Sequence, residues 1–196
     1  MNAPEMKTIE SERARSRRLL ASAARVGVAV VALSLSAGIA VPVGPVPFTL
    51  QILVLGAVVA VMPAGEAVCA VASYLALGAL GAPVFSGYAG GLARLLGPSG
   101  GFLYGFLPAA AAGAGLRCLL GRTRLPYPAA VLAAVLACIA VAYFFGWAHL
   151  VVVGQMGPAV AFSVACAPFI ACDLVKAGMA CGVAVSLRGV RERRES

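Results

Sequence analysis

The stretch Pro158–Leu187, PAVAFSVACAPFIACDLVKAGMACGVAVSL, constrains the fold more than any other part of the sequence. It is almost wholly apolar and longer than the about 20 residues that a helix needs to cross the hydrocarbon core of a bilayer. The pattern therefore predicts a membrane-spanning helix. Its two charged residues, Asp173 and Lys176, are three positions apart and so share one helix face. If one helix covers the whole stretch, both charges lie near the bilayer midplane, where a charge is costly.

This acid–base pair has two interpretations. The two side chains can form a structural ion pair, in which each neutralises the other inside the membrane. Alternatively, they can anchor a polar ligand, because a carboxylate accepts N–H donors and an ammonium donates to carbonyl or carboxylate oxygens. A small solute with an amide or urea-like group would satisfy both side chains. On the residues alone, both interpretations stay open.

The composition is that of an integral membrane protein. Hydrophobic residues make up 62% of the 196 residues and charged residues 11%, whereas soluble domains average about 45–50% and about 25%. The chain has room for about six spans and for no separate soluble domain. We expect a cytoplasmic tail at 1–18, an all-α membrane domain of six transmembrane helices at 19–187, and a basic cytoplasmic tail at 188–196. The expected spans are Leu19–Val41, Thr49–Met62, Glu66–Leu80, Phe102–Leu120, Ala129–Phe145 and the opening stretch.

The positive charges indicate how the chain is oriented. All of the 15 basic residues except Arg94 and Lys176 lie in the first 25 residues, in the 117–124 connection or at 188–194. Basic residues concentrated in alternate connections are typical of cytoplasmic segments. The distribution therefore predicts that both termini are cytoplasmic, and it argues against a nucleic-acid-binding role for the net charge of +8.

The sequence offers little for catalysis or metal binding. The six cysteines form no CxxC pair, and His149 is the only histidine. The chain has no HExxH motif, no pair of carboxylates within a span and no GxxxxGK[ST] phosphate loop. We therefore predict that it is not an enzyme and holds neither a metal nor a cofactor. Any ATP-driven transport would need separate subunits.

Three irregular segments fall on the predicted outer side. The 41–51 segment, VPVGPVPFTLQ, is rich in proline, and the 81–101 segment holds 7 of the 23 glycines. Irregular backbone at membrane depth is tolerated where it lines a cavity or is buried in protein. These segments and the 147–158 connection are therefore expected to gather at one outward-facing mouth above Asp173 and Lys176. Phe85 and Tyr88 are candidates to flank a small molecule there.

Ala23 and Gly27 form a small-xxx-small step in the first expected span. Small residues with this spacing let membrane helices approach closely. They serve either to pack this helix inside the same protein or to dock a partner membrane subunit.

Three motifs, taken in order, resemble the BioY family, the biotin-specific substrate-capture (S) components of energy-coupling factor (ECF) transporters. VPVGPVPFTLQ at 41–51 is similar to the family's VPVPFTLQ signature. The stretch at 77–106, LGALGAPVFSGYAGGLARLLGPSGGFLYGF, resembles LGxxGLPVFxGxxGG…GPTGGYLxGF, and PFIACDLVK at 168–176 resembles PFxxxDxxK. The departures are Ala82, Ser99 and Phe102 in the second motif and an additional Gly44-Pro45 in the first.

The resemblance implies a six-helix fold that binds biotin near its outer face. Asp173 would accept from the ureido N–H groups, and Lys176 would assist at the polar end of the site. The first loop would cap the site, and the glycine-rich segment would shape the pocket. The implied site residues in these two segments are Phe48, Thr49 and Gln51, and Phe85, Tyr88, Gly90, Gly91, Gly100 and Gly101.

The resemblance also implies partners and a mechanism. A transmembrane coupling subunit and two cytoplasmic ATPases would drive reorientation of the chain in a prokaryotic plasma membrane after capture of biotin. Ala23 and Gly27 would then belong to the docking face. The function predicted is high-affinity biotin capture and uptake as the substrate-binding subunit of an ECF-type ABC transporter. The alternative is a stand-alone carrier for a small polar vitamin or solute.

Overall fold

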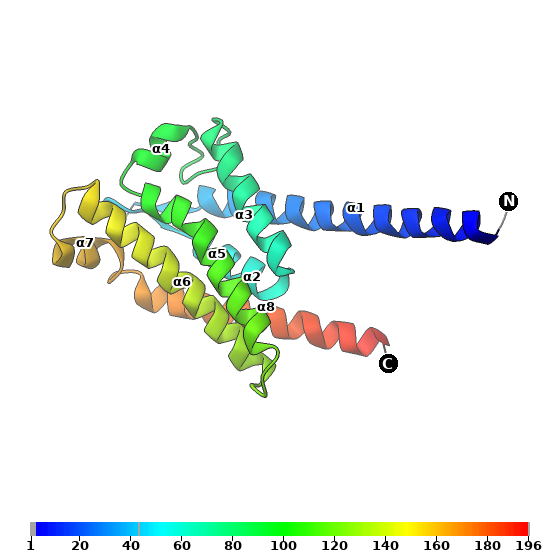
Figure 1. The fold of residues 1–196 in the computed structure, drawn as a ribbon. Coiled ribbons are helices and arrows are strands. Elements are labelled where there is room, and N and C mark those ends of the chain that lie inside the picture. Colours follow the sequence, from blue (N-terminus) through cyan, green and yellow to red (C-terminus); the bar gives the residue numbers. More distant parts are fainter. Residues whose placement is uncertain (1–2, 43, 196) are drawn as a thin grey trace.

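The computed structural model describes residues 3–42 and 44–195, with side chains from residue 10 onward except those of 191, 194 and 195. This part of the chain is mostly helical, with one two-stranded antiparallel ribbon (Figure 1). The elements are α1 (Ala3–Gly38), β1 (Ala40–Val41), β2 (Phe48–Thr49), α2 (Gln51–Val61), α3 (Ala64–Ala79), α4 (Leu92–Leu96), α5 (Gly100–Leu120), α6 (Tyr127–Val152), α7 (Pro158–Ala165) and α8 (Ile170–Glu195).

Within the described residues, four helices are long and apolar enough to cross a bilayer. They are found at Glu10–Gly38, Gly100–Leu120, Tyr127–Val152 and Ile170–Val190. The other two expected spans, α2 and α3, have 11 and 16 residues. At 1.5 Å per residue these helices are about 16 and about 24 Å long, shorter than a hydrocarbon core of about 30 Å. A mostly helical membrane protein is thus confirmed, whereas six spans stay a prediction.

The prediction that 158–187 is one helix is wrong. Residues 166–169 form turns between α7 and α8, and the N–H groups of Phe169 and Ile170 both donate to the carbonyl of Cys166. The physical reason is Pro168, which has no N–H to donate and whose ring clashes with the preceding helical turn. The break moves the start of the last long helix to Ile170, only three residues before Asp173.

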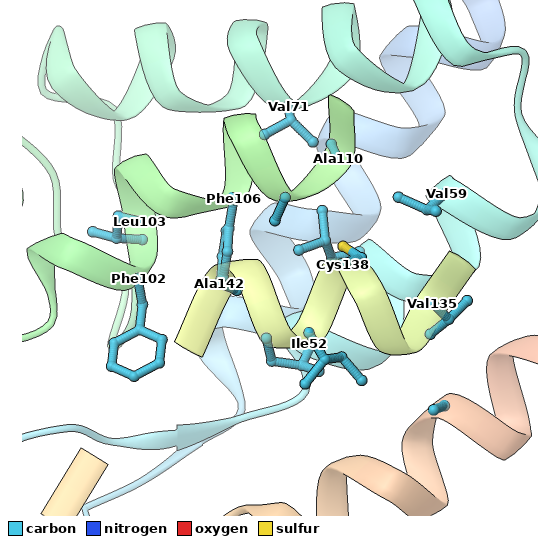
Figure 2. Close-up of a cluster of buried hydrophobic side chains, with 14 of the residues drawn as sticks. Ile52, Val59, Val71, Phe102, Leu103, Phe106, Ala110, Val135, Cys138 and Ala142 are labelled. Carbon is cyan, nitrogen blue, oxygen red and sulfur yellow. The ribbon is translucent and has the colours of Figure 1, made fainter. Parts of the chain in front are cut away.

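The core lies mainly between α5 and α6, with α2 and α3 packed against them. Figure 2 shows Phe106 of α5 pointing toward Ala142 of α6, and Ala110 of α5 beside Val71 of α3. Glycines let α5 and α6 approach closely: a Cβ on Gly113 would lie 2.8 Å from Cys138 Cβ. The predicted elements therefore assemble through small residues, as is usual where helices pack in lipid.

Both termini lie at one end of the molecule, and α7 lies at the opposite end (Figure 1). α1 runs uninterrupted from Ala3 to Gly38, through the expected boundary between residues 18 and 19. Arg25 joins this helix to α3, because its guanidinium donates to both carboxylate oxygens of Glu66, at 2.5 and 2.7 Å. α8 likewise continues past residue 187 into the basic tail.

Candidate functional site

The segment between α1 and α2 folds back as a flap, defined here as residues 40–51. β1 and β2 pair in antiparallel register, with Ala40 opposite Thr49 and Val41 opposite Phe48. The three prolines of the segment cannot continue a helix, so the chain turns outside the helical body before α2 begins. The ribbon brings Phe48, Thr49 and Gln51 back over the start of α8.

Asp173 and Lys176 form a buried ion pair in the first turns of α8. Lys176 Nζ lies 2.7 Å from Asp173 Oδ1, and the two side chains are 7% and 5% exposed. A midplane position is expected only if one helix covers the whole stretch, and that condition is not met: the candidate span begins at Ile170, so the pair lies in its first two turns. The helix break at Pro168 is the cause of the difference.

Other groups hold this pair in place. Tyr143 of α6 donates its hydroxyl to Asp173 Oδ2 at 2.5 Å, so both carboxylate oxygens accept a hydrogen bond. Lys176 Nζ also donates to the carbonyl of Thr49 at 2.7 Å and lies 3.8 Å from the centre of the Phe48 ring. Each charge is therefore compensated, which a buried charge requires, and the ammonium joins α8 directly to the flap.

These side chains also line a pocket of about 50 Å³. A pocket that holds a small-molecule ligand usually encloses about 300–1,000 Å³. The flap thus lies over a nearly filled space. The walls are mainly apolar and aromatic around a polar end: Val46, Pro47, Phe48, Thr49, Gln51, Ile52, Ser86, Ser99, Phe102, Leu103, Phe106, Tyr143, Phe169, Asp173 and Lys176.

Five predicted site residues meet in this pocket: Phe48, Thr49, Gln51, Asp173 and Lys176. The Gln51 amide is buried and oriented, since its Nε2 donates to the Tyr74 hydroxyl at 2.6 Å and its Oε1 accepts from the Thr49 hydroxyl at 3.2 Å. The structure thus brings the acid–base pair and the first-loop residues together, while their contact with a ligand stays a prediction.

Phe85 and Tyr88 lie outside the lining of this pocket. Phe85 is buried behind it, edge-on to Tyr74 with ring centres 5.5 Å apart, in the space left by Gly78. Tyr88 is 60% exposed, has a left-handed φ of 56°, and lays its ring on Gly38 at the end of α1. Both aromatic rings fasten the glycine-rich segment to neighbouring helices.

The four predicted glycines are also outside the pocket lining. Gly91 has a φ of +94°, and its N–H donates to the Gly78 carbonyl at 2.7 Å. Gly90 and Gly100 have no space for a side chain, because backbone carbonyls occupy the position of a Cβ. Gly101 faces α6, where a Cβ would lie 2.6 Å from the Phe145 carbonyl oxygen. Their structural role is to fold the segment and to bring α5 against α6.

The site residues predicted from the sequence do not include Tyr143, Phe102 or Phe169, which join Phe48 in the aromatic walls of the pocket. Phe169 stacks on Phe48 with ring centres 6.1 Å apart, and Phe102 meets Tyr143 edge-on at 6.2 Å. The one available signal was a tyrosine hydroxyl inside an otherwise apolar span, since such a group needs a hydrogen-bond partner. Over residues 3–42 and 44–195, no group of three or more His, Cys, Asp or Glu side chains is placed to hold a metal ion.

Long apolar helices around a small pocket, with a buried acid–base pair under a flap, define an integral membrane protein suited to enclosing a small solute. A sequence model of the BioY family matches residues 6–193. The chain therefore belongs to the BioY family, which confirms the resemblance carried by the three motifs.

Relatives and a solved structure agree with this assignment. The probable biotin transporter BioY of Pyrococcus horikoshii is 37% identical over 84% of this chain and 94% of its own length. The biotin transporter BioY of Rhizobium etli is 36% identical over 84% and 90%. The fold matches a crystal structure of the S-component for biotin from an ECF-type ABC transporter, with a TM-score of 0.81 and 22% identity over 88% of this chain and 93% of that one.

Proposed function

We propose that this chain captures biotin at its outward face and acts as the substrate-binding membrane subunit of an ECF-type ABC transporter. One observation carries the proposal: the buried pair of Asp173 and Lys176 lies beneath a flap in a mostly apolar pocket. The named relatives are biotin transporters, and they match this chain over most of its length. The relatives support biotin as the ligand, and the pocket residues support the way in which we propose that it binds.

The pocket chemistry suits biotin. The ureido ring carries two N–H donors and one carbonyl acceptor, and Asp173 supplies the carboxylate that such donors need. Lys176 is a donor at the same polar end and, when the flap opens, exchanges its bond to the Thr49 carbonyl for one to the ligand. Aromatic rings from the flap, α5 and the α7–α8 turn would pack against the apolar parts of the vitamin.

Calorimetric titration of biotin into detergent-purified protein tests the anchor. Asp173→Asn should weaken binding at least tenfold, about 1.4 kcal/mol, because the amide places an N–H₂ group where the ureido donors need an acceptor. Glu66→Gln is the matched control, since it also neutralises a carboxylate that pairs with a cation, but far from the pocket. Equal affinities for parent protein and Asp173→Asn would contradict the anchor role, and no biotin binding by the parent protein would contradict the function itself.

The partners proposed are a transmembrane coupling subunit and two cytoplasmic ATPases. Ala23 and Gly27 are exposed on α1, and a Cβ on Gly27 would meet nothing within 4 Å, so the small step does not pack inside this protein. Gly27→Leu should therefore reduce co-purification of the coupling subunit while biotin binding survives. Co-purification of the coupling subunit with Gly27→Leu at the level of the parent protein would contradict the proposal that Ala23 and Gly27 form a docking face.

The topology proposed is six spans with both termini in the cytoplasm, in the cell membrane. Support comes from the basic segments and from the common end at which the termini lie. Reporter fusions to each terminus test it. Biotin uptake into liposomes that contain this chain alone, without ATPases, would instead favour the stand-alone carrier.

A further inference from the structure

A second and much larger hollow lies at the opposite end of the helical body from the pocket beneath the flap. It has a volume of about 670 Å³, between the end of α5, the connection to α6 and the last turns of α8. The proposed uptake of biotin does not use it. Its lining residues are Arg117, Cys118, Gly121, Leu125, Tyr127, Pro128, Ala130, Val185, Arg188, Gly189 and Glu192.

The hollow lies at the level of a membrane–water interface. Three candidate spans reach it: one ends at Leu120, one begins at Tyr127, and one ends at Val190. Tyr127 also carries an interfacial contact, because the Arg188 guanidinium lies 4.5 Å from the centre of its ring. Tyrosine and arginine at the ends of spans are typical of the headgroup layer.

Two arginines and one acid line the hollow: Arg117, Arg188 and Glu192. The adjacent connection between α5 and α6 adds Arg122 and Arg124 and no acid. Glu192 accepts from Arg188 Nε at 2.8 Å, which uses one of the five N–H groups that a guanidinium carries. The positive excess favours an anion, and phosphate is the anion for which planar guanidinium groups are best suited.

Arg117 is a fixed cation on the inner wall. Its Nη1 donates to the Ala60 carbonyl at 2.8 Å, and its Nη2 donates to the carbonyl of Met62. Its Nε is buried, with no hydrogen-bond partner in the part of the chain that the structure describes. The protein therefore holds this charge in place before any anion arrives, so little conformational entropy is lost on binding.

The rest of the hollow is apolar. Leu125, Pro128, Ala130 and Val185 give the hollow an apolar wall, and a Cβ on Gly189 would meet nothing within 4 Å. A free phosphate would leave this wall in contact with water. A molecule with an anionic head and acyl chains would cover both kinds of surface.

We propose that this hollow binds an anionic phospholipid, with the phosphate between Arg117 and Arg188 and an acyl chain along Ala130 and Val185. Basic pockets between helix ends commonly take such headgroups. The site is separate from the biotin pocket and does not depend on the proposed function.

Native mass spectrometry of the full chain tests the site, with phosphatidylglycerol or phosphatidylcholine added to the detergent solution. The parent protein should bind phosphatidylglycerol at least fivefold more tightly than phosphatidylcholine. Arg188→Gln should remove most of this preference, and Gly189→Phe should do so without a change in charge, because its ring fills the hollow. Arg13→Gln is the matched control: it removes the same charge from the exposed part of α1 and should keep the preference. Thermal unfolding should show that all three variants fold.

Four outcomes would overturn the proposal. Equal binding of the two lipids would exclude recognition of an anionic headgroup. An equal loss of the preference for phosphatidylglycerol in Arg188→Gln and Arg13→Gln would show that the preference depends on the overall charge of the protein. Competition by inorganic phosphate at concentrations matched to the lipid would indicate a soluble anion as the ligand. Loss of coupling-subunit co-purification in Arg188→Gln, with lipid binding unchanged, would make the hollow a protein-docking site.

Discussion

Tyr143→Phe is the substitution that most directly tests how the pocket is organised. It removes a single hydroxyl, which donates to Asp173 Oδ2 at 2.5 Å. The ring has reason to stay in place, because it packs edge-on against Phe102 with centres 6.2 Å apart. The variant therefore leaves the pocket walls intact and takes one hydrogen bond away from the carboxylate.

The expected effect follows from the type of bond. A hydrogen bond to a charged group contributes about 1.5–3 kcal/mol, and a buried acceptor left without a partner costs about as much. In the variant, Lys176 is the remaining protein donor to Asp173, so the carboxylate is free to rotate away from the ligand. We expect biotin affinity to fall between about tenfold and about one hundredfold.

Calorimetric titration of biotin, together with thermal unfolding in the same detergent, separates binding from folding. Tyr104→Phe is the matched control, because that hydroxyl contacts His149 Nδ1 at 3.0 Å and its ring lies edge-on to Phe145, outside the pocket. Equal affinities for Tyr143→Phe and the parent protein would refute the positioning role. Equal losses in the two tyrosine variants would show that the effect is a general one of removing a hydrogen-bonded tyrosine hydroxyl.

Three further predictions follow from other contacts. Gly101→Ala should destabilise the protein by about 1–3 kcal/mol, because its Cβ would press on α6, while Gly115→Ala, where a Cβ meets nothing within 4 Å, should not; chemical unfolding compares them. Lys176→Gln should speed hydrogen exchange of flap amides in the ligand-free protein at least several-fold, and unchanged exchange would contradict the bond to the flap. A double-mutant cycle on Arg25 and Glu66 should give almost no coupling, since Arg25 is half exposed and water screens the pair, and a strong coupling would contradict this.

The acid–base pair and the flap could be predicted from the sequence because the signals are local. Two charges three residues apart in an apolar stretch share a helix face, and prolines in series exclude a helix. The position of the pair along its helix could not be predicted from hydropathy, because the stretch is apolar on both sides of Pro168. Hydropathy therefore does not show that the helix breaks there.

The roles of the aromatic residues could not be read from sequence. Phe85 and Tyr88 lie in a glycine-rich segment, where aromatic residues are plausible pocket residues. In the structure, however, Phe85 packs on Gly78 and Tyr88 packs on Gly38. Tyr143 reaches a carboxylate 30 positions away, and no pattern within its own helix identifies that partner. Local spacing therefore predicts the two charged residues of the pocket. The residues that form its walls depend on how distant helices pack, which local spacing does not indicate.

The continuity of α1 has a mechanical consequence. From Ala3 to Arg25, where the ion pair with Glu66 fastens it to α3, the helix extends about 33 Å at 1.5 Å per residue. A 30° rotation of the membrane body would carry the tip of such a lever through about 17 Å, given that rise. A change of tilt in the bilayer is thus converted into a large displacement at the N-terminal end of α1.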